Sequence, residues 1–198
     1  MNTIKTWRRW GAGLTLCLAL AGCAHVTQVA SGNAVIGDRL NVQLDRPWNQ
    51  FAHGLGNDIP TWTQEGVTVD SLQFFVGIKS GQPIATLSSD GKDHKPLNFR
   101  ATMEPNDVVA LFEAMLTRDG SSFQMDKLEP ADFLGGQGFR FEYSLNRKVD
   151  DVPMRGVAYA AIRNGELFAI HFTAPRLVYF PRYQAPIDAL ARGAQLRG

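Results

Sequence analysis

The chain has 198 residues, of which 44% are apolar and 20% are charged, and its formal net charge is +1. This length allows one domain with a substantial hydrophobic core, and the composition is that of an ordinary globular protein. The balanced charge argues against binding to nucleic acid, which calls for a strongly basic surface.

The N-terminus has the organisation of an export signal. The basic residues Lys5, Arg8 and Arg9 precede an apolar run from Trp10 to Leu20. A membrane-spanning helix needs about 20 apolar residues, so this run is too short to span a bilayer. It is typical of a signal peptide and is set aside when the fold is considered.

The signal ends in the sequence Leu20-Ala21-Gly22-Cys23, which resembles the lipobox of bacterial lipoproteins. The resemblance implies cleavage before Cys23, a diacylglyceryl group on its thiol and a further acyl chain, such as palmitate, on its amine. Several acyl chains make a nearly permanent membrane anchor. Ala24 stands where lipoproteins retained in the inner membrane usually have aspartate, which implies the periplasmic face of the outer membrane. An ordinary secretory signal and an uncleaved amphipathic anchor are the alternatives.

Processing at this site removes Cys17 and acylates Cys23, which leaves no thiol for a disulfide, a metal or a nucleophile. It also leaves 17 basic and 19 acidic residues. We expect a signal peptide over 1–22, a flexible tether over 23–37 and a single domain over 38–198, with no cofactor and no metal.

In the first half of the domain, alternation of apolar and polar residues predicts strands. One strand is expected over Leu40–Leu44, and a pair within Trp62–Lys79, divided near Gly66 or at Asp70-Ser71. In the second of these, Leu72, Phe74, Val76 and Ile78 are expected to share one face. Loops are expected over 50–60 and 88–95.

One helix and then a series of strands follow. Pro105 suits the first turn of a helix, and the stripe that follows at helical spacing predicts a face packed on a sheet; it comprises Val108, Leu111, Phe112, Met115 and Leu116. Alternation predicts a strand from Phe139 to Asn146, after a glycine-rich turn. Asn164-Gly165 is the strongest signal for a two-residue hairpin turn, here between strands 154–163 and 166–173. A closing helix is expected over 178–196, with Pro186 awkward inside it.

This order of elements predicts an α+β fold in which helices cover an antiparallel sheet. The last hairpin, from Gly156 to the sequence ending in Thr173-Ala174-Pro175, leads into an aromatic-rich helix. It is similar to the end of PsbP-like domains, including small DcrB-type lipoproteins. The resemblance implies an α/β/α sandwich and a binding or accessory role, and it brings no catalytic residues.

No catalytic motif is evident. The chain has no Gly-x-Ser-x-Gly nucleophile motif, and its four histidines are scattered. Asp90, Asp93 and His94 miss the ligand spacing of a calcium loop. We therefore expect a non-enzyme, because an active site would need distant groups to converge, for instance His171 with Asp150 or Glu142.

Two functions remain open. The first is a non-catalytic accessory or binding lipoprotein of the cell envelope, which would engage the membrane through Cys23 and another envelope protein through its surface. Trp48 and Trp62 are the candidate partner contacts, together with Tyr179 and Tyr183; core packing is the alternative for these aromatics. The second is a small-molecule or lipid carrier with a cavity between sheet and helix, lined by the faces that carry Phe139, Phe141 and Phe172.

Overall fold

The computed structural model describes residues 26–51, 59–85 and 96–197. The elements, in chain order, are β1 Val26–Val29, β2 Gly32–Ile36, β3 Leu40–Leu44, β4 Trp48–Phe51, β5 Thr61–Thr63, β6 Ser71–Lys79, α1 Pro105–Leu116, β7 Ser122–Phe133, β8 Gly136–Arg147, β9 Val152–Arg163, β10 Glu166–Pro175, α2 Tyr179–Arg192 and β11 Gln195–Leu196. The predicted α+β class is confirmed.

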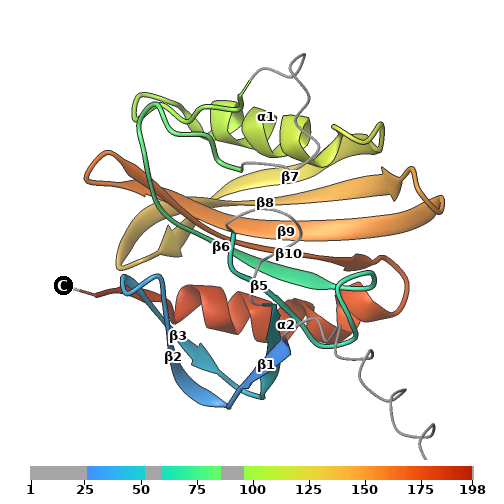
Figure 1. The fold of residues 1–198 in the computed structure, drawn as a ribbon. Helices are drawn as coiled ribbons and strands as arrows, with labels where there is room; N and C mark the ends of the chain where they lie inside the picture. The colour runs from blue at the N-terminus through green and yellow to red at the C-terminus, as the bar shows by residue number, and fades with distance from the viewer. Residues whose placement is uncertain (1–25, 52–58, 86–95, 198) are drawn as a thin grey trace, which may run out of the picture.

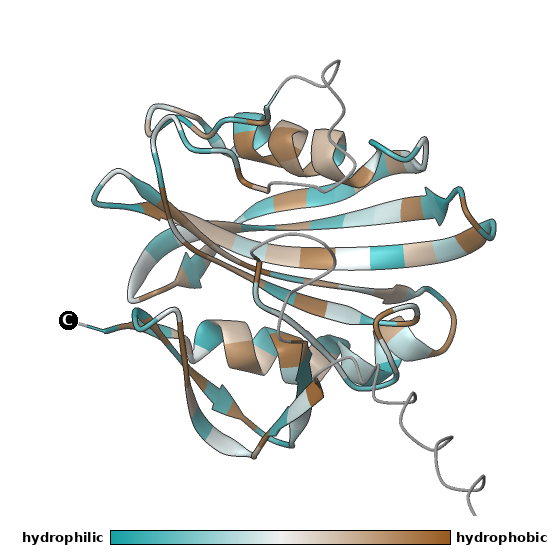
Figure 2. Cartoon of the chain, in the orientation of Figure 1, coloured by the Kyte–Doolittle hydropathy of each residue, from teal (hydrophilic) through white to brown (hydrophobic). Residues whose placement is uncertain are grey.

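The central layer is an antiparallel sheet of eight strands in the order β1-β4-β5-β6-β10-β9-β8-β7. Helix α1 covers one face (Figure 1). Helix α2 and a small sheet of order β11-β3-β2 cover the other face. Figure 2 shows apolar and polar positions interspersed along the strands. In β10 every residue from Leu167 to Phe172 is buried, and neighbouring residues enter separate cores on the two faces of the sheet.

The long hairpins follow the sequence signals closely. Asn164 and Gly165 both have positive φ angles, as a type I′ turn requires, and they join β9 to β10. The glycine-rich segment before β8 is a turn in which Leu134 and Gly135 have positive φ. The predicted division of 62–79 is confirmed, because a turn over 64–70 separates β5 from β6.

The single-face prediction for β6 is wrong beyond Val76. The register against β10 shifts between Ala169 and Leu167, which is the signature of a β-bulge. Gly77, at φ 67°, supplies the left-handed backbone that the bulge needs. The bulge inverts the alternation, so Ile78 packs in the same core as Phe75.

The predicted tether is also wrong in most of its length. Residues 26–36 form β1 and β2, and Ala34 and Ile36 are buried in the core beneath α2. At the other end, α2 stops at Arg192, and Leu196 belongs to β11, which pairs with β3. Pro186 lies inside α2 without ending it.

Candidate functional site

His171 of β10 is fully buried, with an exposed fraction of 0%. Its Nδ1 lies 3.0 Å from Oε1 of Gln73, and its Nε2 lies 2.6 Å from the hydroxyl of Tyr143. An amide oxygen only accepts, so Nδ1–H donates to Gln73 and Nε2 accepts the hydroxyl proton of Tyr143. Burial lowers the pKa of His171 to about 3 and raises the pKa of Tyr143, so both groups are neutral.

The surroundings of His171 are close-packed. The ring of Phe112 from α1 lies 5.6 Å from the imidazole, and that of Phe75 lies 6.5 Å away. The ring of Tyr143 occupies the space where a Cβ on Gly156 would be, so only glycine fits there. This arrangement supports a structural role for the histidine, with its two nitrogens satisfied inside the core.

The groups named as possible partners of His171 lie elsewhere, so that constellation is not formed. Glu142 faces α2 on the opposite side of the sheet, where it forms ion pairs with Arg140 and Arg155. Asp150 lies in the β8–β9 turn, where Arg147 donates to its carboxylate over 2.6 and 2.9 Å. The Arg155–Glu142 pair depends on the register of β9 against β8, whereas Arg147 and Asp150 are only three residues apart in the sequence.

A cluster of charged groups lies between α2 and the sheet. Arg140 is paired with Glu142 at 2.6 Å and with Asp188 of α2 at 3.3 Å. The hydroxyl of Tyr159 donates to Asp188 over 2.9 Å. Burial alone would raise the pKa of Glu142, but hydrogen bonds and charges from Arg140 and Arg155 outweigh it and lower that pKa. The cluster fastens α2 to β8 and β9.

Trp48 and Trp62 belong to the core, with exposed fractions of 2% and 3%. The Trp62 ring lies 4.7 Å from that of Phe74, and the Trp48 ring 6.3 Å from that of Tyr183. The observed burial agrees with core packing, and neither indole offers a surface to a partner in this conformation. Tyr183 is also buried, and its hydroxyl donates to Glu65 over 2.6 Å.

The expected carrier cavity is not where it was predicted. Phe139 and Phe141 face α1, whereas Phe172 faces α2, so these residues lie in different cores. Their exposed fractions are 7%, 0% and 0%. No single cavity can be lined by all three.

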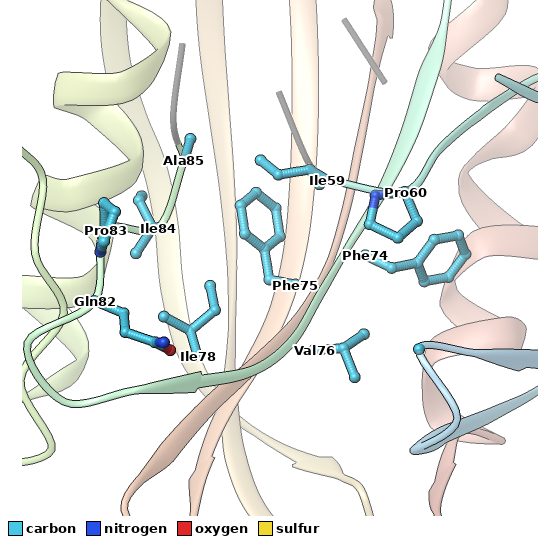
Figure 3. Close-up of a pocket in the computed structure, with 11 residues that line it drawn as sticks. Ile59, Pro60, Phe74, Phe75, Val76, Ile78, Gln82, Pro83, Ile84 and Ala85 are labelled. Atoms are coloured by element: carbon cyan, nitrogen blue, oxygen red, sulfur yellow. The ribbon is translucent and has the colours of Figure 1, made fainter. Parts of the chain in front are cut away.

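An open apolar pocket of about 430 Å³ lies instead beside β6 (Figure 3). Phe75 and Ile78 project toward segment 82–85, while Phe74 and Val76 project to the other side of the strand. The remaining lining residues are Gly37, Ile59, Pro60, Gln82, Pro83, Ile84 and Ala85.

The pocket lies where the pairing between β5 and β6 ends. β5 pairs with β6 only at Leu72 and Gln73, and the N–H of Phe74 donates to the carbonyl of Pro60 over 3.1 Å. Beyond Phe74, no strand among the described residues pairs with this margin of β6. The pocket therefore combines an apolar lining with a strand margin that has no neighbouring strand in the described part of the chain. Sequence reasoning missed it, because nothing local marks where β5 ends.

Several predictions fall outside the described residues. They concern the signal peptide, Cys23, the histidines at 25 and 53, and the group Asp90, Asp93 and His94. Within the described ranges, no cluster of three or more potential metal ligands occurs. No helix in those ranges is long and apolar enough to cross a bilayer.

No family model matches the sequence, and no curated protein matches it. The fold, however, is that of PsbP-like proteins. Cyanobacterial PsbP (CyanoP) from Synechocystis sp. PCC 6803 superposes with a TM-score of 0.55 at 15% identity, over 93% of this chain and 100% of that chain. LpqN, involved in cell envelope biogenesis of Mycobacterium tuberculosis, superposes with a TM-score of 0.46 at 10% identity, over 88% of this chain and 92% of that one.

Proposed function

We propose that the chain is a non-catalytic lipoprotein, held by lipid on Cys23 at the periplasmic face of the outer membrane. In this proposal its folded domain is a binding module for another envelope component. The observation that carries the proposal is the open apolar pocket beside β6. The lipobox supports the location, and the PsbP-like fold is compatible with a binding role.

The pocket is suited to binding because water there contacts apolar side chains. Val76 and Ile78 are only half-buried, and Pro83 is exposed. Covering such a surface with a partner releases that water and stabilises the complex. The sealing of His171 and Tyr143 in the core supports the non-catalytic part of the proposal, because neither can reach a substrate without unfolding of the core.

A small-molecule or lipid carrier is the second candidate. The volume of about 430 Å³ favours it, since pockets that hold small ligands run from roughly 300 to 1,000 Å³. A partner protein and a carried ligand would occupy the same pocket, so one experiment can separate them.

The experiment places a photo-crosslinking amino acid at Gln82, on the exposed rim of the pocket, in the acylated protein within intact envelopes. Gln137, exposed in the β7–β8 hairpin, is the matched control. We expect one protein adduct of defined mass from position 82 and none from position 137. An adduct of small-molecule mass would establish the carrier instead, and no adduct at position 82 would contradict both functions.

The anchor is tested separately. The mass of the N-terminal peptide should show acylation on Cys23, and Cys23→Ala should abolish it. An unacylated wild-type peptide would refute the anchor without bearing on the pocket.

A further inference from the structure

One end of the large sheet carries an unusual concentration of exposed aliphatic residues. Two connections meet there: the β8–β9 turn over 148–151 and the β10–α2 connection over 176–178 (Figure 1). We call these two segments the loop end. Val149 is 81% exposed, Leu177 is 80% exposed and Val178 is 54% exposed. Single exposed aliphatic residues are normal, but three in adjoining connections need an explanation.

The two segments are neighbours because of strand register. Pro175 at the end of β10 pairs with Met154, and the N–H of Arg176 donates to the carbonyl of Pro153 over 2.9 Å. Val152 pairs with Arg147 across the β8–β9 turn. The pairing of β8, β9 and β10 thus places both connections at the same end of the sheet.

The charges at the loop end favour an anionic surface. Lys148 and Arg176 form no ion pair with any described residue. Asp150 is paired with Arg147, whereas Asp151 accepts from the neutral amide of Asn146 over 2.6 Å and keeps its charge. Three basic residues, Arg147, Lys148 and Arg176, stand against these two carboxylates, so the net charge beside the aliphatic residues is +1.

Behind Arg176 lies a polar recess of about 400 Å³. Ser122, Gln124, Ser144 and Asn146 contribute to its lining, together with parts of β9. The hydroxyl of Ser144 already donates to Asp126 over 2.8 Å, and the amide of Asn146 donates to Asp151. The guanidinium of Arg176 with the side chains of Ser122 and Gln124 remains to bind a phosphate, which takes several hydrogen bonds at once.

We propose that the loop end contacts an anionic phospholipid surface, with Val149, Leu177 and Val178 at the headgroup boundary and Lys148 and Arg176 beside phosphate groups. Apolar side chains at the boundary and cations near anionic lipid are the two contributions that hold proteins on bilayer surfaces. The inference rests on the proposed envelope location, which supplies the membrane. The first described strand begins at Val26, and the three residues from Cys23 span at most about 10 Å, so an anchored domain stays close to the bilayer.

The test uses a chain that begins at Ala24, which keeps every described element but lacks the lipid. Its sedimentation with vesicles of phosphatidylglycerol and phosphatidylethanolamine is compared with that on phosphatidylcholine vesicles. We expect binding to the anionic vesicles, weakened at least fivefold by Val149→Ser with Leu177→Ser, and weakened by salt or by Lys148→Gln with Arg176→Gln. Val35→Ser with Met125→Ser, at residues 48% and 43% exposed elsewhere, is the matched control and should bind as the wild type does.

A second measurement guards against altered folding. A polarity-sensitive dye on Val149→Cys should shift to the blue on anionic vesicles, whereas the same dye on Met125→Cys should not. Absence of binding, equal loss in the control pair, or equal dye shifts at both positions would overturn the proposal. Because no acyl chain is present, failure here refutes the loop end and leaves the anchor and the β6 pocket untouched.

Discussion

His171 shows how a titratable residue can serve the core. Its two nitrogens are satisfied by Gln73 and Tyr143, and aromatic rings close the site. Leaving either partner unsatisfied in the interior costs about 1–3 kcal/mol, so the three residues depend on one another. No local pattern in the sequence marks Gln73 as the partner of His171, because Gln73 lies 98 residues away.

The depressed pKa of His171 predicts acid sensitivity. Between pH 6.5 and about 3, the unfolded chain holds a proton on this histidine that the folded chain lacks. Stability therefore falls as the pH falls through this window, by up to about 1.4 kcal/mol per pH unit. We expect His171→Gln to flatten that part of the profile, measured by urea unfolding between pH 7 and pH 4.

The control is Gln73→Leu, which should lower stability at every pH but keep the slope, because the histidine still titrates. Parallel profiles for the wild type and His171→Gln would show that other groups cause the acid sensitivity.

Helix α2 is held on the sheet by contacts with distant residues, which cannot be predicted from the sequence of the helix alone. Its buried residues include Phe180, Tyr183 and Ile187. The ion pairs beneath the helix join Asp188 to Arg140, 48 residues earlier in the chain. In β6 the alternation of the sequence is clear, but the bulge at Gly77 interrupts it in the structure.

Loss of the central carboxylate should loosen α2. Glu142→Gln leaves Arg140 and Arg155 without their shared anion in a site where the Glu142 side chain is only 11% exposed. Breaking a buried ion pair in this way costs about 3 kcal/mol, which denaturant unfolding would detect.

Glu129→Gln is the matched change, because Glu129 also pairs with Arg140 but is 35% exposed. It should have a much smaller effect on stability. Equal losses of stability in the two variants would mean that burial of the carboxylate does not determine the strength of its ion pair.

At the scale of the whole molecule, the first two strands tie residues 26–36 into the fold. β1 extends the large sheet beside β4, and β2 joins β3 in the small sheet over α2. The first described strand thus begins only three residues after Cys23, where a flexible tether was predicted.

A chain that begins at Gly37 should therefore be less stable than one that begins at Ala24. It loses the burial of Ala34 and Ile36 and exposes the margins of β3 and β4. We expect a thermal midpoint lower by several degrees, or failure to fold, in a calorimetric comparison. Equal thermal midpoints would mean that residues 24–36 do not stabilise the domain, as the predicted tether requires.

The sequence by itself determined the types of most elements and the α+β class. These depend on local patterns: alternation in the strands, helical spacing in α1 and α2, and the Asn164-Gly165 turn, each of which acts within a few residues. Tertiary structure decided the rest, namely the sealed histidine, the charged cluster beneath α2, the apolar pocket beside β6 and the loop end. Each of these brings together residues from distant strands, and their register depends on packing of the whole chain, which no local pattern records.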